Sequence, residues 1–238
     1  MENFNTITYN AIAKNLKKEK DQLVPKKLVL LGDTATQLLN KGLRGYAYEV
    51  GIDLEIIDGE YDQIDLQVFN PSSEIYDSDA EFFLIYKSAL KLRKKYYSTP
   101  LQEKVTFADK EISVYKDYIN TINSKQNCNI ILFNFFSLPD MVFNNYGSKL
   151  KHSWTYQSKL LNLKLMDLAS ENENVFICDI DNLQSLKGRK QTFDPQVYIR
   201  TDIAISLDFL PSLSRSVMDI ILATTGKFKK CLILDLDN

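Results

Sequence analysis

The chain contains little cysteine, and the cysteines it has are not spaced for chemistry. Cys128, Cys178 and Cys231 are three residues in 238, lie far apart, and are each embedded in an apolar run. No Cys-x-x-Cys pair exists, so the spacing of a zinc site or of a thioredoxin-like redox pair is missing. We expect all three to be small buried side chains in a reducing compartment.

The chain also lacks an excess of positive charge and a long hydrophobic run. Its 29 lysine and arginine residues are matched by 31 aspartate and glutamate residues, for a formal net charge of −2. Nucleic acids and anionic membranes bind basic surfaces, so neither is expected as a partner. No apolar run approaches the ~20 residues of a membrane-spanning helix, and the amino terminus does not resemble a signal peptide. We expect a cytoplasmic chain.

Common catalytic and nucleotide-binding motifs are missing as well. The sequence has no P-loop, no GxGxxG, no HExxH and no GxSxG. A chain of this length can still bury roughly 70–75% of its unfolded surface, so one domain needs no disulfide or metal to hold it together. The function must therefore be sought in less obvious patterns.

The segment Lys27–Leu39 (KLVLLGDTATQLL) is the clearest structural signal in the chain. Four consecutive apolar residues predict a strand buried on both faces, as in a parallel sheet. Gly32 permits a tight turn, and Asp33 or Thr34 can cap the helix that follows. Sites in such sheets lie at the carboxyl ends of strands, so Gly32, Asp33 and Thr34 are candidate site residues, with helix capping as the alternative interpretation.

Predicted strands alternate with predicted helices along the whole chain. This pattern is typical of an α/β fold with a doubly wound, mainly parallel sheet of about five strands. The most apolar strand, 129–136, is expected to be central, and 188–211 is expected to be loops with short turns. The predicted strands are 28–31, 52–57, 81–86, 129–136 and 175–178, with another at 230–234, and the predicted helices fall within 3–21, 35–50, 61–69, 87–97, 112–122, 161–168 and 213–221.

The carboxyl-terminal Asp235-Leu236-Asp237-Asn238 follows a short apolar run. Residues two apart on a strand point the same way, so the two carboxylates can bind one hard cation such as Mg²⁺. One of them could then attack a phosphoryl group while the other handles the leaving-group proton. The same apolar-strand-then-DxDN pattern occurs at 175–182, so acids that merely face solvent at a strand end are the alternative for either copy.

The final strand with Asp235 and Asp237 resembles the first motif of the haloacid dehalogenase (HAD) superfamily, in the form used by FkbH-like, subfamily IIIC proteins. The preceding Thr225-Gly226-Lys227, and several further motifs in the same order as in that family, extend the resemblance over nearly the whole chain. Those motifs are Gly32-Asp33-Thr34 with Gln37-Leu38-Leu39, Tyr61-Asp62-Gln63, Asn70-Pro71-Ser72-Ser73-Glu74-Ile75-Tyr76 and Asp179-Ile180-Asp181.

The resemblance implies a division of the chain and roles for its last residues. Residues 1–226 would form an amino-terminal domain like an SGNH hydrolase, with a three-layer, flavodoxin-like architecture, and 227–238 would begin a HAD phosphatase domain. Asp235 matches the catalytic nucleophile and Mg²⁺ ligand, and Asp237 matches the acid/base that also binds the metal. Further HAD residues would lie beyond Asn238, so the chain alone is expected to be inactive as a phosphatase.

The SGNH-like part departs from the hydrolase pattern. Thr34 occupies the position of the serine nucleophile, and Asn134 matches the oxyanion-hole asparagine. The base of such enzymes comes from an Asp-x-x-His pair, which this sequence lacks, and the single histidine, His152, lies before a mid-chain helix. Threonine can act as a nucleophile only with a base, so ester hydrolysis is not the expected activity.

Three functions are consistent with these observations. The first is a domain that positions an acyl carrier protein or a phosphorylated three-carbon acid for an FkbH-like enzyme, with Gly32, Asp33, Thr34 and Asn134 lining the pocket. The second is a non-catalytic binding module with a degenerate esterase fold. The third is an esterase or acyltransferase that depends on Thr34.

Overall fold

A computed structural model describes residues 7–226. In this part of the chain five strands form one sheet in the order β2-β1-β3-β4-β5, and every neighbouring pair is parallel. The predicted α/β class and five-stranded parallel sheet are confirmed. The strands are β1 (Val24–Gly32), β2 (Ile52–Asp58), β3 (Phe82–Tyr86), β4 (Asn129–Phe133) and β5 (Val175–Cys178).

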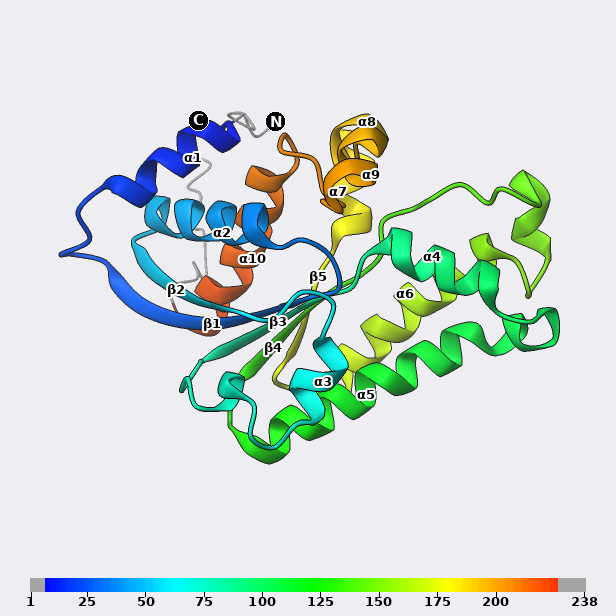
Figure 1. The fold of residues 1–238 in the computed structure, drawn as a ribbon, viewed down its shortest axis with the longest axis horizontal. Coiled ribbons are helices and arrows are strands. Elements are labelled where there is room, and N and C mark those ends of the chain that lie inside the picture. Colours follow the sequence, from blue (N-terminus) through cyan, green and yellow to red (C-terminus); the bar gives the residue numbers. More distant parts are fainter. Residues whose placement is uncertain (1–6, 227–238) are drawn as a thin grey trace, which may run out of the picture.

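Helices cover both faces of the sheet and give three layers (Figure 1). Helices α1, α2 and α10 pack together on one face, and α3, α5 and α6 lie on the other. The α-helices are α1 (Tyr9–Lys14), α2 (Gln37–Glu49), α3 (Ile64–Phe69), α4 (Ala89–Ser98), α5 (Phe107–Lys125), α6 (Trp154–Ser170), α7 (Ile180–Lys187), α8 (Arg189–Thr192), α9 (Pro195–Thr201) and α10 (Leu210–Thr224). Short 3₁₀ helices are η1 (Asn15–Lys17), η2 (Glu74–Tyr76), η3 (Leu101–Thr106) and η4 (Asn144–Lys149).

The interior strands form the centre of the core. All five residues of β3 are buried, as are the last five of β1, because helices cover both faces of the sheet there. Strand β2 is an edge strand and is half-buried, as its alternating sequence predicts. Cys128 and Cys178 are buried free thiols, and burial raises the pKa of both, so neither is a reactive thiolate. Cys231 lies outside the described residues.

Two features of the sequence that weaken regular structure have a local explanation. Pro25 lies inside β1, where it pairs with Asp53 of β2, and β3 joins β1 only from Leu28 onward. A residue that has a neighbouring strand on only one side can lack an N–H without losing a hydrogen bond of the sheet. Gly45 lies in the middle of α2 because α1 crosses it: a Cβ there would be 2.4 Å from the carbonyl oxygen of Ile12.

The prediction that 129–136 is the central strand is wrong. β3 occupies the middle of the sheet, and β4 lies between β3 and β5 and ends at Phe133. Phe135 and Phe136 are buried after they leave the strand, and the amide of Phe135 donates to the Asn162 side chain on α6 (2.9 Å). Their apolar character therefore reflects packing of the loop after β4.

Two further segments differ from expectation. The segment 188–211 contains α8 and α9, and α9 begins with Pro195 after Asp194, whose carboxylate accepts from the amides of Gln196 and Val197. The amino-terminal helix is shorter than predicted, with a capped α1 followed by η1. The predicted strand at 230–234, and the start of the predicted helix at residue 3, lie outside the described residues.

Candidate functional site

The turn after β1 places Asp33 at the carboxyl edge of the sheet. The amide of Asp33 donates to the carbonyl of Tyr86 at the end of β3 (3.2 Å). Its carboxylate accepts from the amide of Ser88, just before α4 (2.8 Å). Helix α2 begins after Thr36, which makes no side-chain cap. The interpretation that Asp33 or Thr34 caps this helix is therefore wrong, because the Asp33 side chain turns toward the neighbouring strand.

Burial dominates the electrostatics of Asp33. Asp33 is only 9% exposed, and desolvation raises the pKa of its carboxyl group from 3.8 to about 6. The amide of Ser88 and the ammonium groups of Lys91 and Lys87 act in the opposite direction without cancelling this effect. Strongly shifted carboxyl groups cluster at functional sites, which marks Asp33 as the candidate centre of the site.

Lys91 of α4 links three loops around Asp33. Its ammonium donates to the backbone carbonyl of Asp33, and it forms ion pairs with Asp62 (3.2 Å) and Asp202 (3.6 Å). It also lies 5.0 Å from the ring centroid of Tyr61, whose hydroxyl donates to Asp202 (2.6 Å). Burial alone would lower the pKa of Lys91, but these acidic neighbours hold it above its usual value. No sequence motif points to Lys91, because its partners lie far apart in the chain.

A cavity of about 400 Å³ opens beside Asp33, between α3, α4 and α5. Leu66 contributes apolar surface, and Glu111 forms an acidic wall. The Glu111 side chain is only 2% exposed and forms ion pairs with Lys87 (3.5 Å) and Lys95 (2.5 Å). The cavity thus offers apolar surface together with groups of both charges, a combination suited to a small polar ligand.

Thr34 lies behind this cavity rather than in its lining. The residue is 1% exposed, and its hydroxyl has no hydrogen-bond partner among residues 7–226. Asp202 is close, because its carbonyl accepts from the amide of Ala35 (3.3 Å), but the fourth residue of Asp202-Ile203-Ala204-Ile205 is a buried isoleucine. The ring of His152 packs against Phe143 instead. The turn therefore has an acid nearby but no imidazole base.

Asn134 directly follows β4 at the same edge of the sheet, and its side-chain amide bonds to the start of α7. It donates to the Asp179 carboxylate (2.7 Å) and accepts from the amides of Ile180 (2.7 Å) and Asp181 (3.2 Å). These contacts hold the first turn of α7 against the strand. Of the four predicted site residues, only Asp33 lines the 400 Å³ cavity. Gly32 and Thr34 lie in the turn after β1 outside the lining, and Asn134 lies beside α7.

The two DxDN segments can be compared only in part. Asp179 caps α7 by accepting from the amide of Asn182 (3.0 Å), so this copy serves the helix start. Asp235 and Asp237 lie outside the described residues. Within residues 7–226, no group of three His, Cys, Asp or Glu side chains is placed to hold a metal ion.

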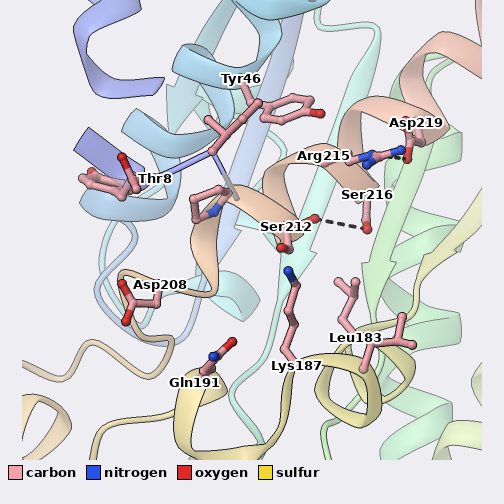
Figure 2. A pocket seen from close by; sticks show the side chains of 14 residues that line it. Thr8, Tyr46, Leu183, Lys187, Gln191, Asp208, Ser212, Arg215, Ser216 and Asp219 are labelled. Atoms are coloured by element: carbon pink, nitrogen blue, oxygen red, sulfur yellow. Dashed lines mark hydrogen bonds and ion pairs between the residues drawn. The ribbon is translucent and has the colours of Figure 1, made fainter. Parts of the chain in front are cut away.

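A second, larger cavity of about 690 Å³ lies between α7 and α10, with Tyr46 of α2 at its far side (Figure 2). Figure 2 shows Lys187 and Leu183 of α7 facing Ser212 of α10. No sequence motif points to this cavity, because its lining comes from polar and apolar helix positions. No helix within 7–226 is both long enough and apolar enough to span a bilayer.

Known structures define the class of this fold. The lipase Lip_vut3 from a goat rumen metagenome has a TM-score of 0.54 at 10% identity, covering 82% of this chain and 96% of that one. The acetyl xylan esterase AlAXEase has a TM-score of 0.51 at 12% identity, covering 82% and 99%. The fold is that of the SGNH-hydrolase class. Within that class, the profile of the FkbH N-terminal domain matches residues 27–222, and the chain belongs to this family.

A crystal structure with much higher identity is also similar. It is the N-terminal part of the protein BF1531 from Bacteroides fragilis, containing a phosphatase domain and complexed with Mg. It is 34% identical, with a TM-score of 0.88 over 97% of this chain. The chain spans 60% of the length of that structure. No curated protein matches the chain.

Proposed function

We propose that this chain is the amino-terminal domain of an FkbH-like enzyme and positions its substrate without hydrolysing it. The substrate would be a phosphorylated three-carbon acid, which the whole enzyme transfers to an acyl carrier protein with loss of phosphate. Membership in the FkbH N-terminal family supports this proposal, as does the similarity to a structure that contains a phosphatase domain with Mg.

One observation carries the proposal that the domain binds rather than cleaves. At the position where a hydrolase of this fold holds an activated nucleophile, Thr34 is 1% exposed, and its hydroxyl has no hydrogen-bond partner within the described residues. The neighbouring cavity combines apolar surface with three lysines, Lys87, Lys91 and Lys95, and with the carboxyl groups of Asp33, Asp62, Asp65 and Glu111. A site of this kind can hold a small polar ligand through groups of both charges, while the buried Thr34 hydroxyl has no hydrogen-bonded partner to take its proton.

The phosphatase chemistry would belong to the carboxyl-terminal acids. Asp235 would be the nucleophile, and Asp237 would move the leaving-group proton. Their two carboxylates suit Mg²⁺, which when bound neutralises phosphoryl charge. In a longer form of the protein, Asp235→Asn should abolish magnesium-dependent phosphatase activity while leaving substrate binding by the amino-terminal domain intact. Activity that survives this substitution would show that the motif is misassigned.

Calorimetric titration of the chain with 3-phosphoglycerate, a phosphorylated three-carbon acid, tests binding directly. Leu66→Trp narrows the cavity at an exposed lining position and should weaken binding at least tenfold. Phe69→Trp is the matched control, because Phe69 lies on the same helix, is also exposed, and does not line the cavity. Equal affinities for the two variants would mean that the ligand does not use this cavity.

The competing esterase function is tested with p-nitrophenyl acetate. The chain, Thr34→Ala and Thr34→Ser should all show the same background rate, because the Thr34 hydroxyl is buried and has no hydrogen-bond partner to activate it. Hydrolysis by the chain that Thr34→Ala removes and Thr34→Ser retains would establish a threonine-dependent esterase and overturn the proposal.

A further inference from the structure

Helix α4 has an unusual charge distribution. It carries four basic residues and no acidic one. Lys91 and Lys95 pair with acids that line the 400 Å³ cavity. Lys94 is exposed and forms no ion pair within residues 7–226, and Arg93 reaches only the carbonyl of Pro139 (3.5 Å). One side of the helix therefore faces the cavity, and its other basic groups remain available to a partner.

The segment 139–152 is attached to α4 at both of its ends. Near the start, the Tyr97 hydroxyl donates to the Asp140 carboxylate (3.4 Å) and accepts from the amide of Met141 (3.0 Å). At the other end, the Tyr96 hydroxyl donates to the carbonyl of His152. The helix and this segment thus form one continuous surface, which we name the α4–loop surface.

The segment adds positive charge to this surface. Its single acid, Asp140, is 3% exposed, and its carboxylate accepts from the amides of Val142 (2.9 Å) and Phe143 (3.0 Å). Lys149 and Lys151 are exposed and form no ion pair in the described part of the chain. The surface is basic even though the chain has a net charge of −2.

Apolar side chains lie among these cations. Met141 is 70% exposed, and Val142 and Tyr146 are each 61% exposed. Lys104 completes the basic border, with its ammonium 4.8 Å from the ring centroid of Tyr96. Apolar groups gathered on a surface and bordered by charge are typical of a protein interaction site.

We propose that the α4–loop surface docks a carrier protein that presents acidic side chains around an apolar centre. The partner class rests on the proposed function, in which an acyl carrier protein delivers or receives the acyl group. Docking here would place the carrier beside the cavity, because Lys95 lines the cavity and Lys94 is its neighbour in the chain. Met141 and Val142 offer aliphatic contacts rather than base stacking, which favours a protein over a nucleic acid.

Binding is measured with two probes: a holo acyl carrier protein and a synthetic amphipathic helix with acidic residues around leucines. The triple variant Lys94→Glu/Lys149→Glu/Lys151→Glu should weaken both at least tenfold, because like charges then face each other. The matched control reverses three other exposed lysines that form no ion pair within residues 7–226, Lys14, Lys17 and Lys125, and should bind as the unmodified chain does. Met141→Ser should weaken binding at constant charge.

The possible outcomes distinguish a failure of the docking surface from a failure of the proposed function. Carrier binding that the triple variant leaves unchanged overturns the surface but not the function. Binding of the acidic helix, lost in the triple variant, without carrier binding supports the surface and counts against the carrier function. Binding of neither probe overturns the docking proposal. Tighter binding of single-stranded RNA or of phosphatidylglycerol vesicles, lost in the same variant, also overturns it.

Discussion

Replacing Asp33 with asparagine should stabilise the fold at neutral pH. A buried carboxyl whose pKa is raised from 3.8 to about 6 costs the folded state up to about 3 kcal/mol once it ionises. Asparagine has nearly the same shape and can still accept from the Ser88 amide. The pKa of about 6 already includes the attraction to Lys91, but the asparagine NH₂ group adds a buried donor that needs a partner, so we expect a net gain of about 1–2 kcal/mol at pH 8.

The pH dependence follows from which state holds the proton. Between pH 3.8 and about 6 the folded chain binds more protons at Asp33 than the unfolded chain does, so the stability of the native protein falls as pH rises through this window. Above about pH 6 the cost is constant, and below 3.8 it is absent. Asp33→Asn removes this dependence, and the difference in stability between variant and native chain should grow from pH 4 to pH 7.

Urea unfolding followed by circular dichroism at several pH values measures this difference. Asp33→Ala is a useful control, because it also removes the charge but leaves the Ser88 amide without its acceptor. It should be less stable than Asp33→Asn by about 1–3 kcal/mol. Parallel pH profiles for Asp33→Asn and the native chain would refute the reasoning, since they would mean that Asp33 ionises as freely in the folded as in the unfolded state.

Five further substitutions test the packing of the site and of α2 by urea unfolding. Asn134→Ala should lower the free energy of unfolding by about 2 kcal/mol, because two backbone amides at the start of α7 lose their acceptor. A decrease below about 0.5 kcal/mol would contradict this expectation. Glu111→Ala should lower the free energy of unfolding by about 3 kcal/mol, because it removes a buried carboxylate that pairs with two lysines. Lys95→Ala should lower it by less than about 1 kcal/mol, because the Lys95 side chain is 58% exposed. Gly45→Ala should lower the free energy of unfolding by about 1–3 kcal/mol, because the new methyl group meets the backbone of Ile12. Gly42→Ala should lower it by less, because the methyl group there meets the Ser214 hydroxyl, which can rotate away.

The layered sheet was predictable because its strands have distinctive sequences. Runs such as Leu28–Leu31 are apolar throughout, and such runs alternate with helical periods, which leaves few topologies. The order of the strands was less accessible. Phe135 and Phe136 made β4 look longer and more central than it is, because apolar residues that pack in a loop have the same letters as residues in a strand.

The part of the candidate site that is formed by residues adjacent in sequence was predictable. Asp33 follows a buried strand and a glycine, so its place at the sheet edge could be inferred from neighbouring residues. Its partners could not, because Lys91 and Asp202 come from α4 and the end of α9, and no spacing in the sequence connects them. The engagement of Asn134 with α7 was hidden for the same reason, since it depends on the start of a helix 46 residues later.

The single ammonium of Lys91 connects the turn after β1, the loop before α3 and the carboxyl end of α9. None of these three segments can change position without altering the charge environment of the other two. A ligand that competes for that ammonium would loosen the hold on Asp62 and Asp202 together. Occupancy of the cavity could thus be sensed at α9, on a part of the surface that the ligand never touches.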